Sequence, residues 1–214
     1  MRTIKKVASH IFIDGFGGMT QGLFATLIIG TMIQQIGLLI GGSTGNVIYL
    51  LGKAAAALTS AGIGVGVAVK YGESPLVTVS AAVAAMVGGY AGKITGGTFF
   101  VDGNAVLAGP GEPLGAFIAA FAGITCGHLV SGKTKVDIIV TPVITIGAGS
   151  VVGLLVGPPI SQMMTGLGSI INWATEQRPF IMGIVVSVVM GMVLTLPISS
   201  AALGIILNLS GLAA

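Results

Sequence analysis

The chain has 214 residues, of which 54% are hydrophobic and only 7% are charged. Soluble domains average about 25% charged residues, so this composition excludes an ordinary soluble protein and predicts an all-α, polytopic membrane protein. The net charge of +3 comes from basic residues scattered along the chain, and we therefore expect no nucleic-acid partner. The single cysteine, Cys126, excludes an intrachain disulfide.

Residues 1–17 are predicted to form an interfacial segment that leads into the first membrane span. Arg2, Lys5 and Lys6 precede a semi-apolar stretch, an arrangement that also begins a cleavable signal peptide. Asp14 interrupts that stretch and the hydrophobic run continues far beyond signal-peptide length, which favours an uncleaved interfacial helix. An intramembrane position would make Asp14 a functional residue, whereas an interfacial position would make it ordinary.

Long apolar runs predict about six to seven transmembrane helices in a single integral membrane domain over residues 1–214, with the bundle beginning at residue 18. A bilayer crossing needs roughly 20 residues, and glycine, at 36 residues, lets membrane helices pack closely. Residues 201–214 are apolar but too short for a normal crossing, so the chain stops inside a seventh hydrophobic element. The predicted spans are residues 18–40, 47–69, 75–92, 113–130, 136–156 and 180–199. Lys53 lies inside the second of them, where it either snorkels to the interface or has a functional role.

Two connecting segments, residues 93–112 and 157–178, are too mixed in composition for simple solvated loops. The first holds a turn signal at Asp102-Gly103-Asn104 between apolar residues, and the second begins with paired prolines, Pro158 and Pro159, and ends in a polar cluster. Irregular backbone at membrane depth is tolerated only where protein or water covers it. Each segment is therefore expected to be either re-entrant or external.

The distribution of basic residues predicts that the N-terminus is cytoplasmic. Cytoplasmic segments carry an excess of Lys and Arg, and this orientation places only Lys93 and Arg178 on the opposite side. Both connecting segments then share the external side. The residues assigned to the cytoplasmic side are Arg2, Lys5, Lys6, Lys70, Lys133 and Lys135.

A weak internal repeat relates residues 72–93 to residues 111–133. Each copy begins with a Gly-Glu pair ahead of a proline, has paired alanines at the same distance from that proline, and ends in Gly-Lys. The two spans are expected to run in opposite directions. Inverted repeats are common in secondary transporters, whose sites form at the repeat interface, although chance similarity is the alternative in a chain so rich in Gly and Ala.

Two candidate substrate-binding residues lie near opposite ends of the fourth predicted span. Glu112 precedes Pro113 at its start, where a carboxylate caps exposed amides, binds a ligand, or does both. His128 lies near its end, either as a packed, hydrogen-bonded histidine or as a site residue.

Three further candidates, Asn172, Glu176 and Gln177, belong to the polar cluster of residues 172–178. Carboxylates and amides placed together bind the hydroxyls of a sugar well, because their oxygens accept hydrogen bonds. An ion pair between Glu176 and Arg178, or exposure at the membrane interface, is the simpler alternative. The cluster nevertheless makes a sugar or small-solute transporter the favoured reading.

Motifs for other chemistry are absent from the sequence. It contains no Walker phosphate loop, no dinucleotide fingerprint, no HExxH motif and no Cys/His spacing typical of a metal site. We therefore expect no cofactor, no metal and no catalytic residue, and the chain is not expected to be an enzyme by itself.

Several runs resemble the membrane IIC component of a bacterial sugar phosphotransferase system, within the subgroup that includes toxin-regulator membrane proteins of Gram-positive bacteria. The resemblance covers nearly the whole chain and is most specific over residues 157–202. It implies a homodimeric inner-membrane permease that binds a sugar and works with separate IIA and IIB proteins. The runs are GMTQGLFATLIIGTMIQQIG (18–37), GEPLGAFIAA (111–120), SGKTKVDIIVTPVITI (131–146), GPPISQMMTGLGSIINWATEQRPFIMGIVVSVVMGM (157–192) and LTLPISSAA (194–202).

The sequence departs from this family in two respects. Members are usually longer, so the chain is expected to be a fragment, a truncated gene product or a shortened relative. The Gly-Ile-Thr-Glu signature of better-understood sugar IIC families is absent as such, and Ala174-Thr175-Glu176 is its closest match. Two alternatives stay open: a membrane regulator or sensor with this fold, and an ion-coupled transporter that uses the same carboxylates.

Overall fold

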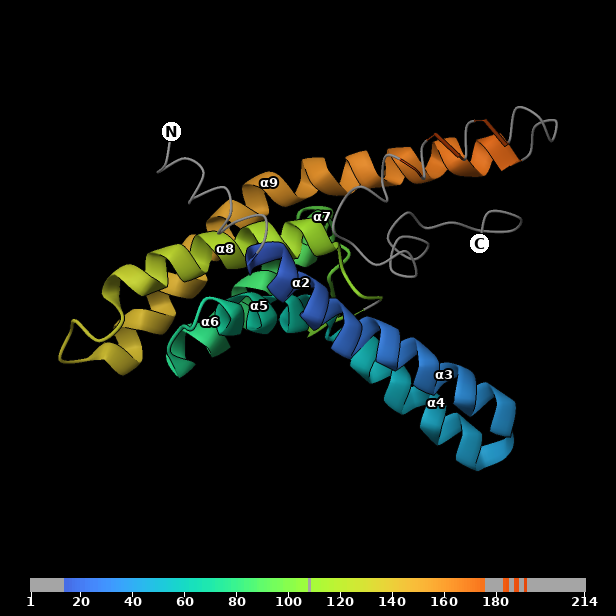
Figure 1. Ribbon diagram of the computed structural model, residues 1–214, viewed down its shortest axis with the longest axis horizontal. Helices are drawn as coiled ribbons and strands as arrows, with labels where there is room; N and C mark the ends of the chain where they lie inside the picture. Colours follow the sequence, from blue (N-terminus) through green and yellow to red (C-terminus); the bar gives the residue numbers. More distant parts are fainter. Residues whose placement is uncertain (1–13, 108, 176–182, 185–186, 189–190, 192–214) are drawn as a thin grey trace.

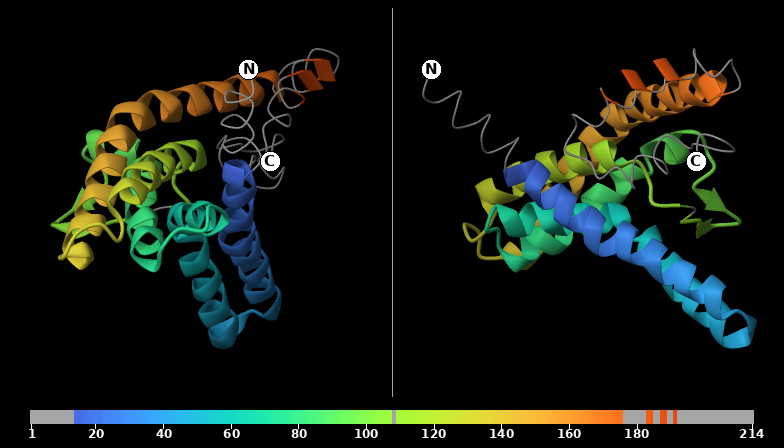
Figure 2. Two further views of the ribbon diagram at one scale, coloured as in Figure 1. Left: turned by 60° about the vertical axis from the view of Figure 1, so that its left-hand side comes forward. Right: turned by 45° about the vertical axis from the view of Figure 1, so that its right-hand side comes forward.

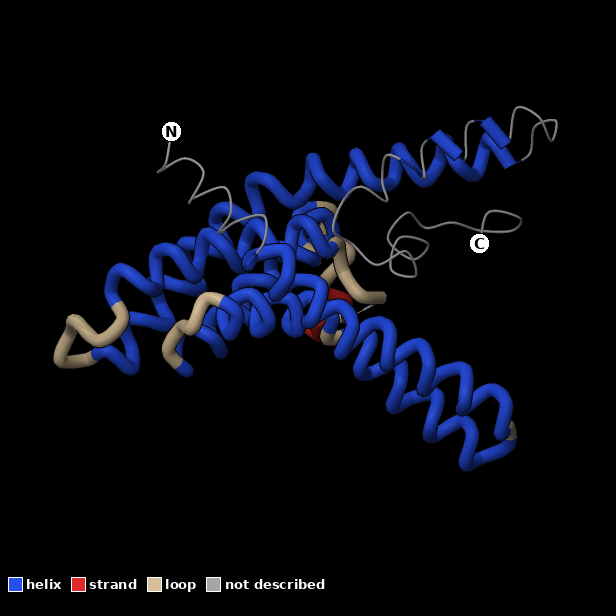
Figure 3. Tube along the Cα trace, viewed as in Figure 1, coloured by secondary structure: helices blue, strands red, loops and turns tan. Residues whose placement is uncertain are grey.

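The computed structural model describes residues 14–107 and 109–175, together with 183–184, 187–188 and 191. The described part of the chain is almost entirely helical, and its only strands form one small hairpin (Figure 3). The predicted all-α class is confirmed.

The first predicted span is confirmed as one continuous apolar helix. It comprises α2 (Phe16–Leu23), a π-helical turn η2 (Phe24–Ile28) and α3 (Ile29–Ile40), and the whole of Phe16–Ile40 has the length and hydropathy of a membrane span. At 1.5 Å per residue, its 25 residues reach about 37 Å, more than the hydrocarbon core of a bilayer.

The second predicted span begins earlier than expected and is broken. A turn at Gly41 and Gly42, whose φ angles of 65° and 64° suit glycine, leads directly into α4 (Gly42–Ala57). Leu58 interrupts the helix, and α5 (Thr59–Lys70) continues at an angle of 52° to α4. Figure 1 shows the consequence: α3 and α4 project from the bundle as a hairpin arm, whereas α2 and α5 stay within the bundle.

Glycines set the spacing between α2 and α5 and between α3 and α4. A Cβ on Gly18 would lie 2.6 Å from the Gly66 carbonyl oxygen, and one on Gly30 would lie 2.8 Å from the Ala56 amide nitrogen. Such distances leave no room for a side chain, so the helix backbones touch directly, as small residues permit in membranes.

In place of the third predicted span, at residues 75–92, the structure has a short helix, α6 (Pro75–Gly89). Its 15 residues fall short of the roughly 20 needed for a crossing. The chain turns at Tyr90 into α7 (Ala91–Thr95) and then forms the hairpin of β1 (Phe100–Val101) and β2 (Asn104–Ala105). The predicted turn signal is where the hairpin reverses, with positive φ at Asp102 and Gly103.

The fourth predicted span is confirmed as α8 (Pro113–Val130), which packs antiparallel to α6. Gly88, near the end of α6, contacts Gly115 at the start of α8, and Val77 lies beside Gly127 at the opposite end. The two copies of the sequence repeat therefore run in opposite directions, as expected.

The fifth predicted span extends much further than its expected end at residue 156. Helix α9 runs from Asp137 to Thr175 with three prolines inside it, Pro142, Pro158 and Pro159. The predicted end of the span at residue 156 is therefore wrong, because the helix continues to Thr175. Proline bends a helix without always ending it, and Figure 2 shows that α9 changes direction part-way along its length.

The buried core lies where α2, α5, α6 and α8 meet. Its largest fully buried side chains include Met19, Leu23, Ile63 and Val77, and Ala81 and Ala120 fill the spaces between them. Helix α9 covers α6 and α8 through further close glycine contacts, such as Gly153 against Gly88.

The predicted count of six to seven spans is not confirmed. Three helices in the described residues, Phe16–Ile40, Pro113–Val130 and part of α9, are long and apolar enough to cross a membrane, or four if the bent α4–α5 pair counts as one span. Residues 1–13 of the predicted interfacial segment, most of the span predicted at 180–199 and all of 201–214 lie outside the described residues.

Candidate functional site

Glu112 is the N-cap of α8, and backbone groups of both α8 and α6 hold it in place. Its carboxylate accepts hydrogen bonds from the amides of Leu114, at 3.2 Å, and Gly115. Its own amide donates to the carbonyl oxygen of Gly89 at 2.7 Å, which fastens the start of α8 to the end of α6. Glu112 precedes the span; burial raises the pKa of its carboxyl, while the two amide hydrogen bonds lower it.

The loop ahead of Glu112 is anchored to the break between α4 and α5. The Ser60 hydroxyl donates to the carbonyl oxygen of Pro110 at 3.0 Å. The Tyr90 hydroxyl lies within hydrogen-bonding distance of two carbonyl oxygens, that of Ala57 at 3.3 Å and that of Gly109. Because these contacts involve α4, α5 and the turn at Tyr90, they fix the position of Glu112 relative to the break.

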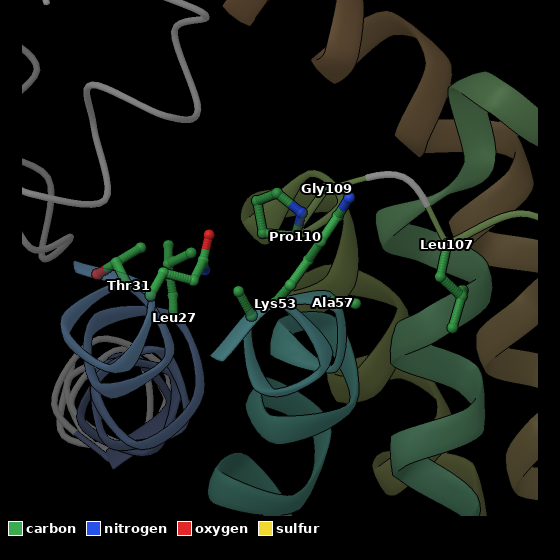
Figure 4. Close-up of a pocket in the computed structure, with 9 residues that line it drawn as sticks. Leu27, Thr31, Lys53, Ala57, Leu107, Gly109 and Pro110 are labelled. Atoms are coloured by element: carbon green, nitrogen blue, oxygen red, sulfur yellow. The ribbon is translucent and has the colours of Figure 1, made fainter. Parts of the chain in front are cut away.

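A cavity of about 200 Å³ lies beside this loop (Figure 4). Its polar lining comes from Thr31 and Gln34 on α3 and from Lys53 on α4, and the segment Gly109–Pro110 closes one side. The sequence offered two signals for this cavity, an amide inside an apolar helix and a lysine inside a predicted span. Of its lining residues, Lys53 is the one for which the sequence suggests a functional role.

His128 lies at the other end of α8 from Glu112. Sixteen residues separate them along the helix, or about 24 Å at 1.5 Å per residue, so the structure does not bring these two candidates together. The His128 side chain is 70% exposed, and its Nδ1 lies 3.0 Å from a carboxylate oxygen of Glu73, in the turn between α5 and α6. The hydroxyls of Ser74 and Ser131 hydrogen-bond at 2.9 Å in the same region.

Comparison with known protein families supplies the identification. Residues 13–214 match the family model described as phosphotransferase system, EIIC.

The chain belongs to the EIIC family of the phosphotransferase system. The match and the long apolar helices together identify an integral membrane protein, a membrane component of phosphotransferase transport. Searches of curated proteins and of solved structures found no significant match to this EIIC chain.

The remaining candidates of this EIIC chain lie at or beyond the end of α9. Asn172 falls in its last turn, while Glu176 and Gln177 lie outside the described residues. Their convergence with Glu112 on one site remains a prediction. Among the residues that the structure describes, no group of three or more His, Cys, Asp or Glu side chains could hold a metal ion.

Proposed function

We propose that this chain is the sugar-binding permease subunit of a phosphoenolpyruvate-dependent phosphotransferase system. The observation that carries the proposal is the EIIC family match over residues 13–214. In this role the protein binds a sugar within the membrane and releases it for phosphorylation by a separate IIB protein, which a IIA protein supplies with phosphoryl groups.

Glu112 is the proposed sugar ligand within the described residues. An ionised carboxylate has about four lone-pair positions, and the Leu114 and Gly115 amides occupy one on each oxygen. The other positions are free to accept hydrogen bonds from sugar hydroxyls. Because the amides already fix the carboxylate, binding costs little ordering of this side chain. Asn172, Glu176 and Gln177 stay as further proposed contacts of the sugar, whereas His128 lies too far along α8 to contact the same sugar as Glu112.

The proposed membrane orientation has support from the packing of the turns. The Ser74–Ser131 hydrogen bond joins the turn after Lys70 to the turn that contains Lys133 and Lys135. Lys93 instead lies 5.4 Å from the ring centroid of Tyr90, near the Glu112 end of α8. Gathering of lysines at one end favours placing that end, and the N-terminus, in the cytoplasm. We further propose that the protein is a homodimer in the inner membrane.

Binding of a panel of neutral sugars to the purified protein tests the site. Calorimetry on the protein in lipid nanodiscs should find one sugar whose affinity falls at least tenfold in Glu112→Gln, because the amide offers one acceptor oxygen where the carboxylate offers two. Glu73→Gln is the matched control, since Glu73 lies at the opposite end of α8, and it should bind like the unaltered protein. Unchanged affinity in both Glu112→Gln and Glu176→Gln would overturn the site.

Transport assays test whether sugar uptake is coupled to phosphorylation. Uptake of that sugar into membrane vesicles should require phosphoenolpyruvate together with the IIA and IIB proteins, and the product inside should be the sugar phosphate. Uptake driven by a proton or sodium gradient alone would instead identify an ion-coupled transporter. Sugar binding without any uptake would identify a sensor.

A further inference from the structure

The cavity beside the Glu112 loop lies where the helices around it are irregular. Leu27, from the π-helical turn η2, and Ala57, the last residue of α4 before the break, both contribute to its wall. Irregular backbone at membrane depth is tolerated where it lines a cavity. The irregular positions in the two helices therefore coincide with a space that a ligand can enter.

Lys53 supplies the charge of this cavity. It is the one ionisable side chain among the described lining residues, it is exposed, and the structure records no ion pair between it and any described residue. Figure 4 shows its side chain directed toward the Gly109–Pro110 segment rather than away from the cavity. A lysine within a span normally pairs with a charge or marks a ligand pathway, and the described cavity wall contains no carboxylate to pair with it.

Gln34 adds a second donor. Its Nε2 reaches the carbonyl oxygen of Gly30 at 3.4 Å, a long and weak hydrogen bond, so an amide N–H is free to turn toward a ligand. Thr31 has its hydroxyl proton committed to the carbonyl oxygen of Ile28 at 2.8 Å, and it retains only acceptor capacity. The cavity thus offers an ammonium and an amide donor against an otherwise mainly apolar wall.

We propose that this cavity is a binding site for a small oxyanion, a carboxylate or phosphate group, which Lys53 neutralises and Gln34 orients. The anion belongs either to a soluble acid or to the headgroup of an anionic phospholipid. The site is distinct from that of Glu112, which presents a carboxylate and selects hydroxyl donors, so the two sites take different chemical groups.

Two soluble acids test the proposal, with a neutral sugar as comparison. Calorimetry on the protein in phosphatidylcholine nanodiscs, which lack anionic lipid, should detect binding of glucuronate or inorganic phosphate. That affinity should fall at least tenfold in Lys53→Met and be largely retained in Lys53→Arg. Lys133→Met removes the same charge from an exposed turn and should leave the affinity unchanged. Lys53→Gln replaces Lys53→Met if the methionine variant fails to elute as a single species in size exclusion.

Native mass spectrometry distinguishes the lipid source. After reconstitution with phosphatidylglycerol, an anionic phospholipid that stays bound to the unaltered protein and is lost from Lys53→Met would assign the site to a headgroup. The proposal is overturned if neither soluble acid binds and no phosphatidylglycerol is retained, or if Lys53→Met (or Lys53→Gln in its place) keeps full affinity. Neutral-sugar binding that depends on Glu112 but not on Lys53 would support the proposed permease function whether or not the anion site is confirmed.

Discussion

The two turns that lead into α6 and α8 are built alike but use their carboxylates differently. Each begins with a left-handed glycine, Gly72 with φ of 70° and Gly111 with φ of 75°, followed by a glutamate, and each helix starts with a proline. The first turn has one additional residue, Ser74, between the glutamate and the proline.

That one residue decides which side chain caps the helix. Ser74 accepts the hydrogen bond from the Val77 amide at 3.4 Å, so Glu73 stands outside the cap and pairs with the exposed His128. In the second turn Glu112 is itself the cap and is largely buried. A shift of one position along the chain thus separates a carboxylate that pairs with an exposed histidine from one that is bound by backbone amides.

The largest loss of stability is expected from substitution of the glycine that begins each turn. Both Gly72→Ala and Gly111→Ala place a Cβ on a left-handed residue, which costs about 1–2 kcal/mol. At Gly111 the Cβ also meets the Ser60 hydroxyl and lies 3.1 Å from the Gly89 carbonyl oxygen, while at Gly72 nothing lies within 4 Å. The overlap adds about 1–3 kcal/mol. Thermal unfolding in detergent should therefore show a clearly larger loss for Gly111→Ala, and equal losses would contradict the packing of the Glu112 loop.

A smaller effect is expected from removal of each cap. Glu112→Ala and Ser74→Ala each delete a helix N-cap, at a cost of about 0.5–2 kcal/mol. Glu112→Ala should fall at the upper end, because two amide donors lose their acceptor at a buried position. The shifts in unfolding midpoint of the two variants are compared. A larger shift in Ser74→Ala would show that the Ser74–Ser131 contact contributes more to stability than the buried cap.

The smallest effect is expected at the contact between Glu73 and His128. Glu73→Gln removes the charge that faces His128, and pairs with one largely exposed partner contribute about 0–1 kcal/mol. The midpoint should move little, and less in high salt than in low salt because mobile ions screen the pair. A loss as large as that of Glu112→Ala would mean that the contact of Glu73 with His128 stabilises its turn as much as the cap stabilises the other.

The sequence predicted α8 closely because its boundaries carry clear signals. The Glu112-Pro113 pair marks a helix start, and a basic turn with Gly132 follows its end. The helix over residues 18–40 was also found, since an apolar run of that length has few other structures available in a membrane. Capping by Glu112 follows from the same signals, whereas its burial depends on the packing of α8 against α6.

Other features had weak or misleading signals. The break at Leu58 falls in an Ala-Leu-Thr stretch without glycine or proline, so it arises from packing of α4 and α5 on different neighbours. Pro158 and Pro159 favoured an end of the helix near residue 156, whereas α9 continues through them to Thr175 and changes direction along its length. The sequence marks Gln34 and Lys53 as polar residues within apolar segments, but it does not show that they face one cavity, since they meet the 109–110 segment only through tertiary packing.

The hairpin arm of α3 and α4 extends from the bundle beyond η2 and the break at Leu58. The 12 residues of α3 make an arm of about 18 Å at 1.5 Å per residue. A rotation of about 10° at its base would then carry the tip through about 3 Å by simple leverage. Because glycine contacts lock α3 to α4, both helices would swing together, and the motion would be greatest at the Gly41–Gly42 turn and least at the cavity.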